Sequence, residues 1–394
     1  MKKTIQISLV MGGGRDWMGG VEYIKNIIYA LATLPPEVRS TFEVSLICSI
    51  QLDDVQSEVS KYVGKTYYIE TALEPLTLLN LVRWIIARIL FDQYNPRYDN
   101  FFSKAETAFA YPYFARRERA KSFRSAAWIP DFQHRYLTQF FSKREVRSRD
   151  RYFADIANHA SIVVLSSKTA VADFNKFFSK ATCKVEVLSP RVYPVPAWYA
   201  VDPLRTQRTY RLPDRFFLIS NQFWQHKNHL LVFKALRILQ DQGIYPTVVC
   251  TGHLIDYRNL SFLDVVLHTI DQSGIGSQIY LLGRIPRIDV ISLMRRSLAV
   301  IHPSLFEGWS MVVEETRCLG KPIILSDIPV HCEQNPPHGI LFKNNSVEDL
   351  AMVLADSWRS LTPGPNREHE DIARDSNLKE VQAFGYRFLE IAKG

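Results

Sequence analysis

The sequence predicts an α/β protein with two Rossmann-like domains, each a doubly wound parallel sheet. Three observations lead to this prediction. The chain has 394 residues, more than one ordinary domain uses, and its composition, 47% hydrophobic and 22% charged, is that of a globular protein. Short Val, Ile and Leu runs alternate with helical segments, which is typical of parallel strands covered by helices on both faces. The alternation occurs as two series separated by a proline-rich segment.

The first series runs from residue 4 to residue 190. Residues 21–34 and 168–178 have the pattern of helices. The predicted strands are residues 4–10, 42–50, 126–131, 161–167 and 184–190. The first of them follows two lysines, but its apolar stretch is broken and runs into glycines without a small-residue cleavage site. We interpret it as a strand rather than a signal peptide.

The proline-rich segment, residues 190–214, is the expected hinge, and the second series follows it. Predicted helices include residues 228–242, 257–270 and 288–296. The predicted strands are residues 216–221, 246–252, 278–284, 298–304, 322–327 and 339–342. We expect domains at residues 1–200 and 201–377, with a last helix, residues 378–394, that packs back on the first domain. Ligands of such sheets bind beyond the carboxyl ends of the strands, so a central cleft between two facing domains would collect loops from both.

The net charge of +8 is concentrated in one segment. Residues 115–151 hold eleven lysines and arginines against four acids, a net charge of +7. This favours an anionic partner, either a membrane surface or a phosphorylated acceptor. The alternative is a solvated helix face without a dedicated partner. A nucleic-acid partner is not favoured, because the aromatic residues here lie on apolar runs and no nucleic-acid module pattern is present.

Two further features bear on location. No stretch reaches the roughly 20 apolar residues that span a bilayer; the nearest, residues 76–91, places its polar side chains within one helical arc and predicts an amphipathic helix. The five cysteines are scattered and form no C-x-x-C pair, which argues against a disulfide framework and a zinc site. We therefore expect a reducing, cytoplasmic compartment.

The stretch SLFEGWSMVVEETRCLGKPIILSD, residues 304–327, places two acids eight positions apart between two apolar runs. Gly308 permits a tight turn, and a helix beginning near Met311 would present its N–H groups and positive dipole end to a diphosphate. Glu315 could then accept hydrogen bonds from two adjacent ribose hydroxyls, while Glu307 faces a sugar beyond the phosphates. The alternative is that acids in the first turns of a helix only complement its dipole.

Residues 302–334, HPSLFEGWSMVVEETRCLGKPIILSDIPVHCEQ, followed by residues 339–355, resemble the donor-binding region of glycosyltransferase family 4. These enzymes are retaining transferases of the GT-B fold, and the E-x7-E pair is their hallmark. The resemblance implies that Glu307 approaches the donor sugar and Glu315 binds the ribose of the nucleotide. It also implies donor-binding positions at the intervening corner, namely Gly308, Trp309, Ser310 and Met311.

Residues 216–236 resemble the first strand and helix of the donor domain of that family, where an arginine and, five residues later, a lysine neutralise the diphosphate. The lysine here is Lys227, but Gln222 stands in place of the arginine. Arg284, from LLGRIPR, is a candidate second cation for the departing nucleoside diphosphate. His226 and His229 flank Lys227, yet no third ligand pattern accompanies them, and the family resemblance implies no metal.

Residues 12–31 resemble the glycine-rich loop and first helix of the family, in which Gly19 and Gly20 would let a phosphate or sugar approach the helix start. The glycines do not fit G-x-G-x-x-G, so an oxidoreductase loses its main support. Arg15 is assigned to the acceptor side.

Residues 128–141 resemble the strand on the acceptor side of the family, where many members carry His-Asp. This chain has Pro130 and Asp131 instead. Asp131 is assigned to the acceptor side. His134 is the nearest substitute for the histidine, as a partner of the donor sugar or acceptor hydroxyl, against a purely structural role.

The predicted activity is the transfer of a hexose, with retention, from a nucleoside diphosphate sugar of the GDP-mannose or UDP-sugar type. The acceptor is a hydroxyl of a glycan or lipid-linked molecule, as in cell-surface polysaccharide synthesis. The prediction assigns the donor to residues 201–377, the acceptor to residues 1–200, and neither a metal nor another cofactor. Residues 76–91 and 115–151 would rest on the inner face of an anionic membrane. The alternatives are a nucleotide-sugar epimerase and a GT-B scaffold without activity.

Overall fold

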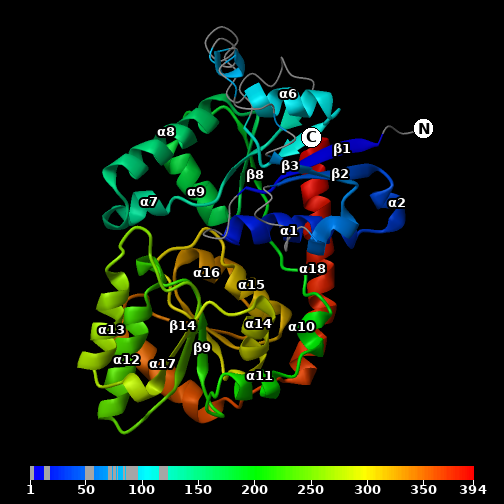
Figure 1. Cartoon of the computed structure of the whole chain (residues 1–394). Helices are drawn as coiled ribbons and strands as arrows, with labels where there is room; N and C mark the ends of the chain where they lie inside the picture. Colours follow the sequence, from blue (N-terminus) through cyan, green and yellow to red (C-terminus); the bar gives the residue numbers. More distant parts are fainter. Residues whose placement is uncertain are drawn as a thin grey trace. The chain divides into compact units, whose positions relative to one another are not determined.

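The computed structural model describes residues 4–12, 18–48, 57–69, 73, 77, 79–82, 85, 96–114 and 123–394. The chain divides into two compact units (Figure 1). The first unit comprises residues 1–132, 147–193 and 378–394, and the second unit comprises residues 133–146 and 194–377. The predicted amphipathic segment, residues 76–91, lies largely outside the described residues. Arg15 and the first part of the predicted basic segment (residues 115–151), namely residues 115–122, also lie outside them.

The first unit is built on parallel strands. One sheet has the order β3-β2-β1-β4-β5 and another the order β6-β7-β8, and all the pairings are parallel. The strands are β1 (Ile5–Val10), β2 (Phe42–Cys48), β3 (Lys65–Tyr68), β4 (Phe109–Tyr111), β5 (Arg124–Ser125), β6 (Ala127–Ile129), β7 (Ile162–Leu165) and β8 (Lys184–Val187). The helices are α1 (Met18–Ala32), α2 (Pro36–Arg39), η2 (Ser60–Tyr62), α6 (Pro96–Lys104), α8 (Lys143–His159) and α9 (Lys168–Phe177). The first residues of α8 belong to the second unit.

The second unit holds a six-stranded parallel sheet in the order β11-β10-β9-β12-β13-β14. Its strands are β9 (Phe217–Ser220), β10 (Val248–Thr251), β11 (Ile279–Gly283), β12 (Val300–His302), β13 (Ile323–Ser326) and β14 (Gly339–Phe342). In Figure 1, α12, α13 and α17 cover one side of these strands, and α14, α15 and α16 cover the other. This is the predicted doubly wound arrangement.

Most helices of the second unit connect or flank these strands, while those within residues 133–140 come from a part of the chain between two strands of the first unit. They are α7 (Gln133–Tyr136), η4 (Thr138–Phe140), α10 (Ala197–Ala200), α11 (Pro203–Thr209), η5 (Gln225–Lys227), α12 (His229–Asp241), α13 (Phe262–Gln272), η6 (Gly276–Gln278), α14 (Arg287–Arg296), α15 (Met311–Cys318), α16 (Pro329–Gln334) and α17 (Val347–Ser360). The helix predicted over residues 257–270 is α13, which begins only at Phe262. The preceding residues form a loop in which the Asp256 carboxylate accepts hydrogen bonds from the Gln225 and Arg258 backbone N–H groups.

The core of the second unit explains why its strands read as continuous apolar runs. Phe217, Val248 and Ile301 on the central strands are fully buried and pack in one cluster with Phe233 and Leu354 from α12 and α17. Strands covered on both faces need no polar face, so their sequences lack the alternation of half-exposed strands. The sheet therefore provides a rigid base for the loops at its carboxyl edge.

The last helix, α18 (Arg367–Lys393), is longer than the predicted segment, residues 378–394. Its residues up to Asn377 belong to the second unit and those from Leu378 to the first. The polar stretch before residue 378 is helical because a few of its side chains are buried and paired. Glu370 accepts hydrogen bonds of 2.6 and 3.0 Å from Arg295. Among the described residues no helix is long and apolar enough to cross a membrane.

Candidate active site

The loops that follow β9 and β12 leave adjacent strands of the second unit. The strand order runs outward in both directions from this pair, since β10 lies beyond β9 and β13 lies beyond β12. Loops at such a switch point form the usual ligand site of an open parallel sheet. The loop after β9 carries Lys227 and the loop after β12 carries Glu307. A backbone hydrogen bond of 2.8 Å from the Leu305 N–H to the His226 carbonyl joins them.

Lys227 and Glu307 form an ion pair between these two loops. Lys227 ends η5, and Asn228, with a left-handed φ of 57°, turns the chain into α12. Asn adopts this conformation more readily than most residues, which suits it to the turn. The Lys227 Nζ lies 2.5 Å from Glu307 Oε1, and the two side chains are 16% and 11% exposed. Water therefore screens this pair only weakly.

His302, the last residue of β12, contacts Glu307 on another side. Asn221 Nδ2 lies 2.9 Å from His302 Nδ1 and donates to it, so the ring proton is on Nε2. The His302 Nε2 lies 2.9 Å from Ser310 Oγ and 3.3 Å from Glu307 Oε1. A neutral imidazole therefore donates toward the carboxylate and links it to the start of α15.

The protonation of this corner follows from burial and charge. Burial raises the pKa of the Glu307 carboxyl, but the Lys227 charge and the His302 hydrogen bond lower it more, so its pKa lies well below the usual range. Burial lowers the pKa of His302 and that of His226. At neutral pH the corner therefore holds a carboxylate surrounded by uncharged imidazoles.

The helix after the corner starts where the sequence predicts. Ser310 is the N-cap of α15, and its Oγ accepts a hydrogen bond of 3.3 Å from the Val313 N–H. Gln334 of α16 accepts from the Ser310 N–H and donates to the Ser310 carbonyl, both at 3.0 Å. The N–H groups of a first helical turn have no partner within the helix and carry the positive end of its dipole. Trp309 and Met311 are half-buried at this start.

Glu315, on the second turn of α15, is buried and pairs with a different cation. Arg287 Nη2 lies 2.6 Å from Glu315 Oε1, and the arginine side chain is 42% exposed. Its guanidinium also lies 5.5 Å from the ring centre of Trp198. Arg284, the arginine singled out from the sequence, is exposed and makes no ion pair within the described residues. The turn at Gly283 and Pro286 makes Arg287, rather than Arg284, the first residue of α14.

Arg258 connects the loop after β10 to the corner. Its side chain forms an ion pair of 3.2 Å with Asp256 and lies 3.1 Å from His226 Nδ1. It also donates a hydrogen bond of 3.1 Å to Gln133. Since His226 precedes Lys227, Arg258 supports the backbone that carries the lysine. Sequence reasoning missed this residue, although the D-x-R spacing in the loop was visible.

The other predicted residues have different surroundings. His134 is buried in α7, within the second unit, with its ring centre 6.4 Å from that of Phe141. Gln222 is half-buried directly after β9, beside Gly252, where a Cβ would lie 3.0 Å from the Gln222 nitrogen. Gly19 and Gly20 lie within the first turn of α1 rather than before it.

Asp131 and the two glycines belong to the first unit, and the second unit contains the remaining described site residues. Glu307 and Lys227 are thus brought together with Gly308 and Ser310, while Glu315 lies on the second turn of α15. Among the described residues, no group of three or more His, Cys, Asp or Glu side chains is placed to hold a metal ion.

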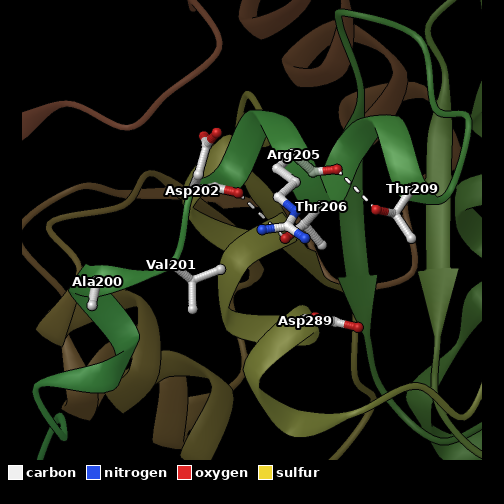
Figure 2. Close-up of a pocket in the computed structure, with 7 residues that line it drawn as sticks. All are labelled: Ala200, Val201, Asp202, Arg205, Thr206, Thr209 and Asp289. Carbon is white, nitrogen blue, oxygen red and sulfur yellow. Dashed lines mark hydrogen bonds between the residues drawn. The ribbon is translucent and has the colours of Figure 1, made fainter.

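A separate cavity of about 420 Å³ lies between α11 and α14 (Figure 2). Its hydroxyls are bonded locally, since Thr206 Oγ1 donates to the Asp202 carbonyl at 3.4 Å and Thr209 Oγ1 donates to the Arg205 carbonyl at 3.0 Å. Asp289 accepts a hydrogen bond of 2.7 Å from Tyr210. None of the predicted site residues lines this cavity, and its polar groups do not indicate a ligand.

The comparisons with known proteins agree with this architecture. Residues 202–358 match the sequence model of the family described as glycosyl transferases group 1. A search of curated protein sequences found no match.

Solved structures resemble the whole chain. A glycosyltransferase from Rickettsia africae is 15% identical, with a TM-score of 0.67, and the match covers 99% of this chain and 98% of that one. Anabaena HepE in complex with UDP and glucose is 16% identical, with a TM-score of 0.65 and 99% coverage of both chains. The sucrose-phosphate synthase of Thermosynechococcus elongatus is 14% identical, with a TM-score of 0.67 and coverage of 99% and 98%. At this identity the likeness concerns the fold, and the predicted GT-B fold is confirmed.

The fold and the matched segment define the class of protein. The chain has two parallel α/β units, and the segment of its second unit that matches the glycosyl transferases group 1 model, residues 202–358, includes Lys227, Glu307 and Glu315. The chain is therefore an enzyme of the transferase class.

Proposed function

We propose that this chain is a retaining glycosyltransferase of family 4 that moves a hexose from a nucleoside diphosphate sugar to a hydroxyl of a glycan or lipid-linked acceptor. The observation that carries the proposal is the corner at the switch point, where the Lys227–Glu307 pair precedes a capped helix start and Glu315 follows on the same helix. Solved structures of similar fold hold UDP and glucose, or UDP-glucose, in Anabaena HepE. UDP-hexoses are therefore the first donors to test.

The bond between the anomeric carbon and the diphosphate oxygen breaks in this reaction, and a bond from that carbon to the acceptor oxygen forms. The acceptor proton leaves with the nucleoside diphosphate. Lys227 and the first N–H groups of α15 stabilise the charge that develops on the departing diphosphate. Glu315 accepts hydrogen bonds from the ribose, and Glu307 orients Lys227 and faces the sugar. Retention by a same-face attack and retention through a glycosyl-enzyme intermediate both stay open.

The roles of the two halves of the chain belong to the same proposal. Residues 201–377 bind the donor and residues 1–200 contribute the acceptor side, without a metal or another cofactor. The acceptor is part of a cell-surface polysaccharide at the cytoplasmic face of a membrane. Support for this location comes from α8, where Lys143, Arg144 and Arg147 are exposed. Flotation with liposomes of neutral and anionic lipid tests it, and absence of binding to both would exclude it.

The donor site is tested by the thermal shift of the purified protein with UDP, GDP, ADP and their sugars. We expect one base to stabilise the wild type and the shift to shrink in Glu315→Gln, because hydrogen bonds to a charged acceptor contribute about 1.5–3 kcal/mol. Glu348→Gln is the matched control, since Glu348 is an exposed acid in the first turn of α17. An equal loss in both variants would mean that Glu315 only complements its helix dipole. Absence of a thermal shift with every nucleotide would favour the alternative, a GT-B scaffold that does not bind a donor.

A further inference from the structure

A cavity of about 670 Å³ in the second unit is distinct from the Glu315 helix. Three pieces of chain form it: the segment from η4 to the start of α8, η5 after β9, and the loop after β10. Its volume falls within the range of about 300–1,000 Å³ that is usual for small-molecule sites. The cavity is therefore large enough for a ligand of a few rings.

The lining combines aromatic faces with amides. Tyr257 is 58% exposed, and Phe140, the last residue of η4, also lines the cavity. The side-chain amides of Gln139 and Gln225 make no hydrogen bond within the described part of the chain. Aromatic faces accept the C–H face of a pyranose ring, and planar amides pair with its hydroxyls, which require both donors and acceptors.

The charge at this cavity is compensated. The Arg258 guanidinium lies 5.1, 5.0 and 5.5 Å from the ring centres of Phe141, Trp224 and Tyr257. Asp256 neutralises it at 3.2 Å, and the side chain of Arg258 is 4% exposed. Glu145 accepts hydrogen bonds from Ser142. An anionic ligand would find no uncompensated cation here, so the lining favours a neutral one.

Two contacts connect the cavity walls to the proposed active site. Arg258 lies 3.1 Å from the ring of His226, which precedes Lys227. Tyr136, from the helix just before η4, stacks on Phe306 with ring centres 5.4 Å apart, and Phe306 precedes Glu307. Both walls of the cavity therefore continue into the loops that carry the Lys227–Glu307 pair.

We propose that this cavity is a saccharide subsite for the acceptor, in which Tyr257 packs against an uncharged pyranose and Gln139 and Gln225 bind its hydroxyls. The inference rests on the proposed transferase function but extends the acceptor side beyond residues 1–200 to Gln225 and Tyr257. It also specifies the acceptor class: a glycan whose sugar unit bound in this cavity carries no charge.

Saturation-transfer NMR on the full-length protein tests the subsite, with methyl α-mannopyranoside, methyl β-glucopyranoside and methyl β-galactopyranoside as probes. We expect at least one glycoside to bind the wild type and its dissociation constant to rise about fivefold or more in Tyr257→Ala. Gln139→Ala should weaken the same glycoside. Tyr245→Ala is the matched control, since Tyr245 is also 58% exposed and does not line the cavity. Absence of binding, or equal binding by Tyr257→Ala and Tyr245→Ala, would overturn the proposal.

Nucleotide binding, measured on the same samples, separates this inference from the proposed function. Tyr257→Ala should retain the thermal shift with the nucleotide that stabilises the wild type. Nucleotide binding without glycoside binding would overturn the subsite alone. Glycoside binding without any nucleotide binding or transfer would support the subsite as a binding site and overturn the transferase function.

Discussion

Glu307 and Glu315 lie eight residues apart on one corner, yet their ion pairs are built in opposite ways. Glu307 pairs with Lys227, which lies on the loop after the neighbouring strand β9, and both side chains are nearly buried. His302 also contacts the Glu307 carboxylate. Glu315 is buried too, but its partner Arg287 reaches it from the start of α14 and keeps 42% of its side chain exposed. Both side chains of the Lys227–Glu307 pair are shielded from solvent, whereas in the Arg287–Glu315 pair only the glutamate is shielded.

The difference indicates different roles. A buried pair cannot lose one partner without leaving an uncompensated charge, so the Lys227–Glu307 pair holds a fixed geometry. An exposed arginine is hydrated and can leave its partner at little cost, so the Glu315 carboxylate can exchange Arg287 for another donor. The first arrangement suits a group that orients a reaction, and the second suits a group that binds a ligand.

The largest expected effect comes from breaking the enclosed Lys227–Glu307 pair. Glu307→Gln leaves the Lys227 charge without its carboxylate, and the loss of one partner of a buried pair costs about 3–5 kcal/mol in unfolding free energy. We expect transferase activity to fall by about 10²- to 10³-fold, the size of the effect of one charge-stabilising group. Urea unfolding and transfer assays measure the two effects.

The double variant Lys227→Met/Glu307→Gln separates stability from chemistry. It removes the unpaired charge, so it should unfold at a higher urea concentration than Glu307→Gln while remaining inactive. A double variant as unstable as the single one would show that packing, rather than charge, accounts for the loss.

The histidines around the enclosed pair give the second effect, a dependence of stability on pH. Burial lowers the pKa of His226, His229, His302 and His331, to about 3 for His229 and His331. Below about pH 6.5 these histidines therefore bind protons in the unfolded chain but stay neutral in the folded chain, so the unfolding free energy falls as the pH falls. Glu307 acts in a lower range: its depressed folded pKa gives a stabilisation that is lost only below about pH 4.5.

His229 offers a clean test of this effect. Within the described residues neither of its ring nitrogens has a hydrogen-bond partner, and its ring stacks on Phe223 at 4.0 Å. His229→Leu removes one titrating group, so the slope of unfolding free energy between pH 6 and 5 should shrink by about 1.4 kcal/mol per pH unit. Urea unfolding at pH 7.5, 6 and 5 measures it. An unchanged slope would show that His229 is not kept neutral by burial.

The sequence predicted the second unit better than the first. All six strands of the second unit appear as apolar runs, because a parallel sheet buries both faces of every strand. In the first unit, β3, β4 and β5 were not predicted, because their sequences, KTYY, FAY and RS, contain no run of Val, Ile or Leu. The start of α13 was placed too early, because the Asp256 loop has no strong breaker residue.

The sequence grouped the candidate site residues only where they lie close along the chain or where the family resemblance joined them. Glu307, Ser310 and Glu315 belong to one stretch, and Lys227 was found by family resemblance. His302, Arg258 and Arg287 were missed as site residues. Arg287 and Glu315 are 28 positions apart in the sequence. Arg258 contacts His226, which is 32 positions away, and Gln133, which is 125 positions away. The order of strands in the sheet decides such contacts, and no local pattern records it.

The smallest expected effect comes from Arg287, the exposed partner in the Arg287–Glu315 pair. An ion pair with an exposed partner contributes about 0–1 kcal/mol, so Arg287→Ala should change the melting temperature little. A ribose that binds Glu315 must share or displace the arginine, so its removal should strengthen nucleotide binding by up to about fivefold. This change is opposite in sign to that of Glu315→Gln, and calorimetric titration measures both.

Arg284→Ala is the companion variant for this prediction. The sequence predicts that Arg284 contacts the diphosphate. If so, Arg284→Ala should bind the nucleotide more weakly than the wild type, and added salt should weaken nucleotide binding by the wild type. A fall in Arg287→Ala instead would mean that the exposed arginine itself contacts the nucleotide. In that case the Arg287–Glu315 pair would be a preformed part of the donor site, and the contrast with the enclosed pair would lie in solvent exposure alone.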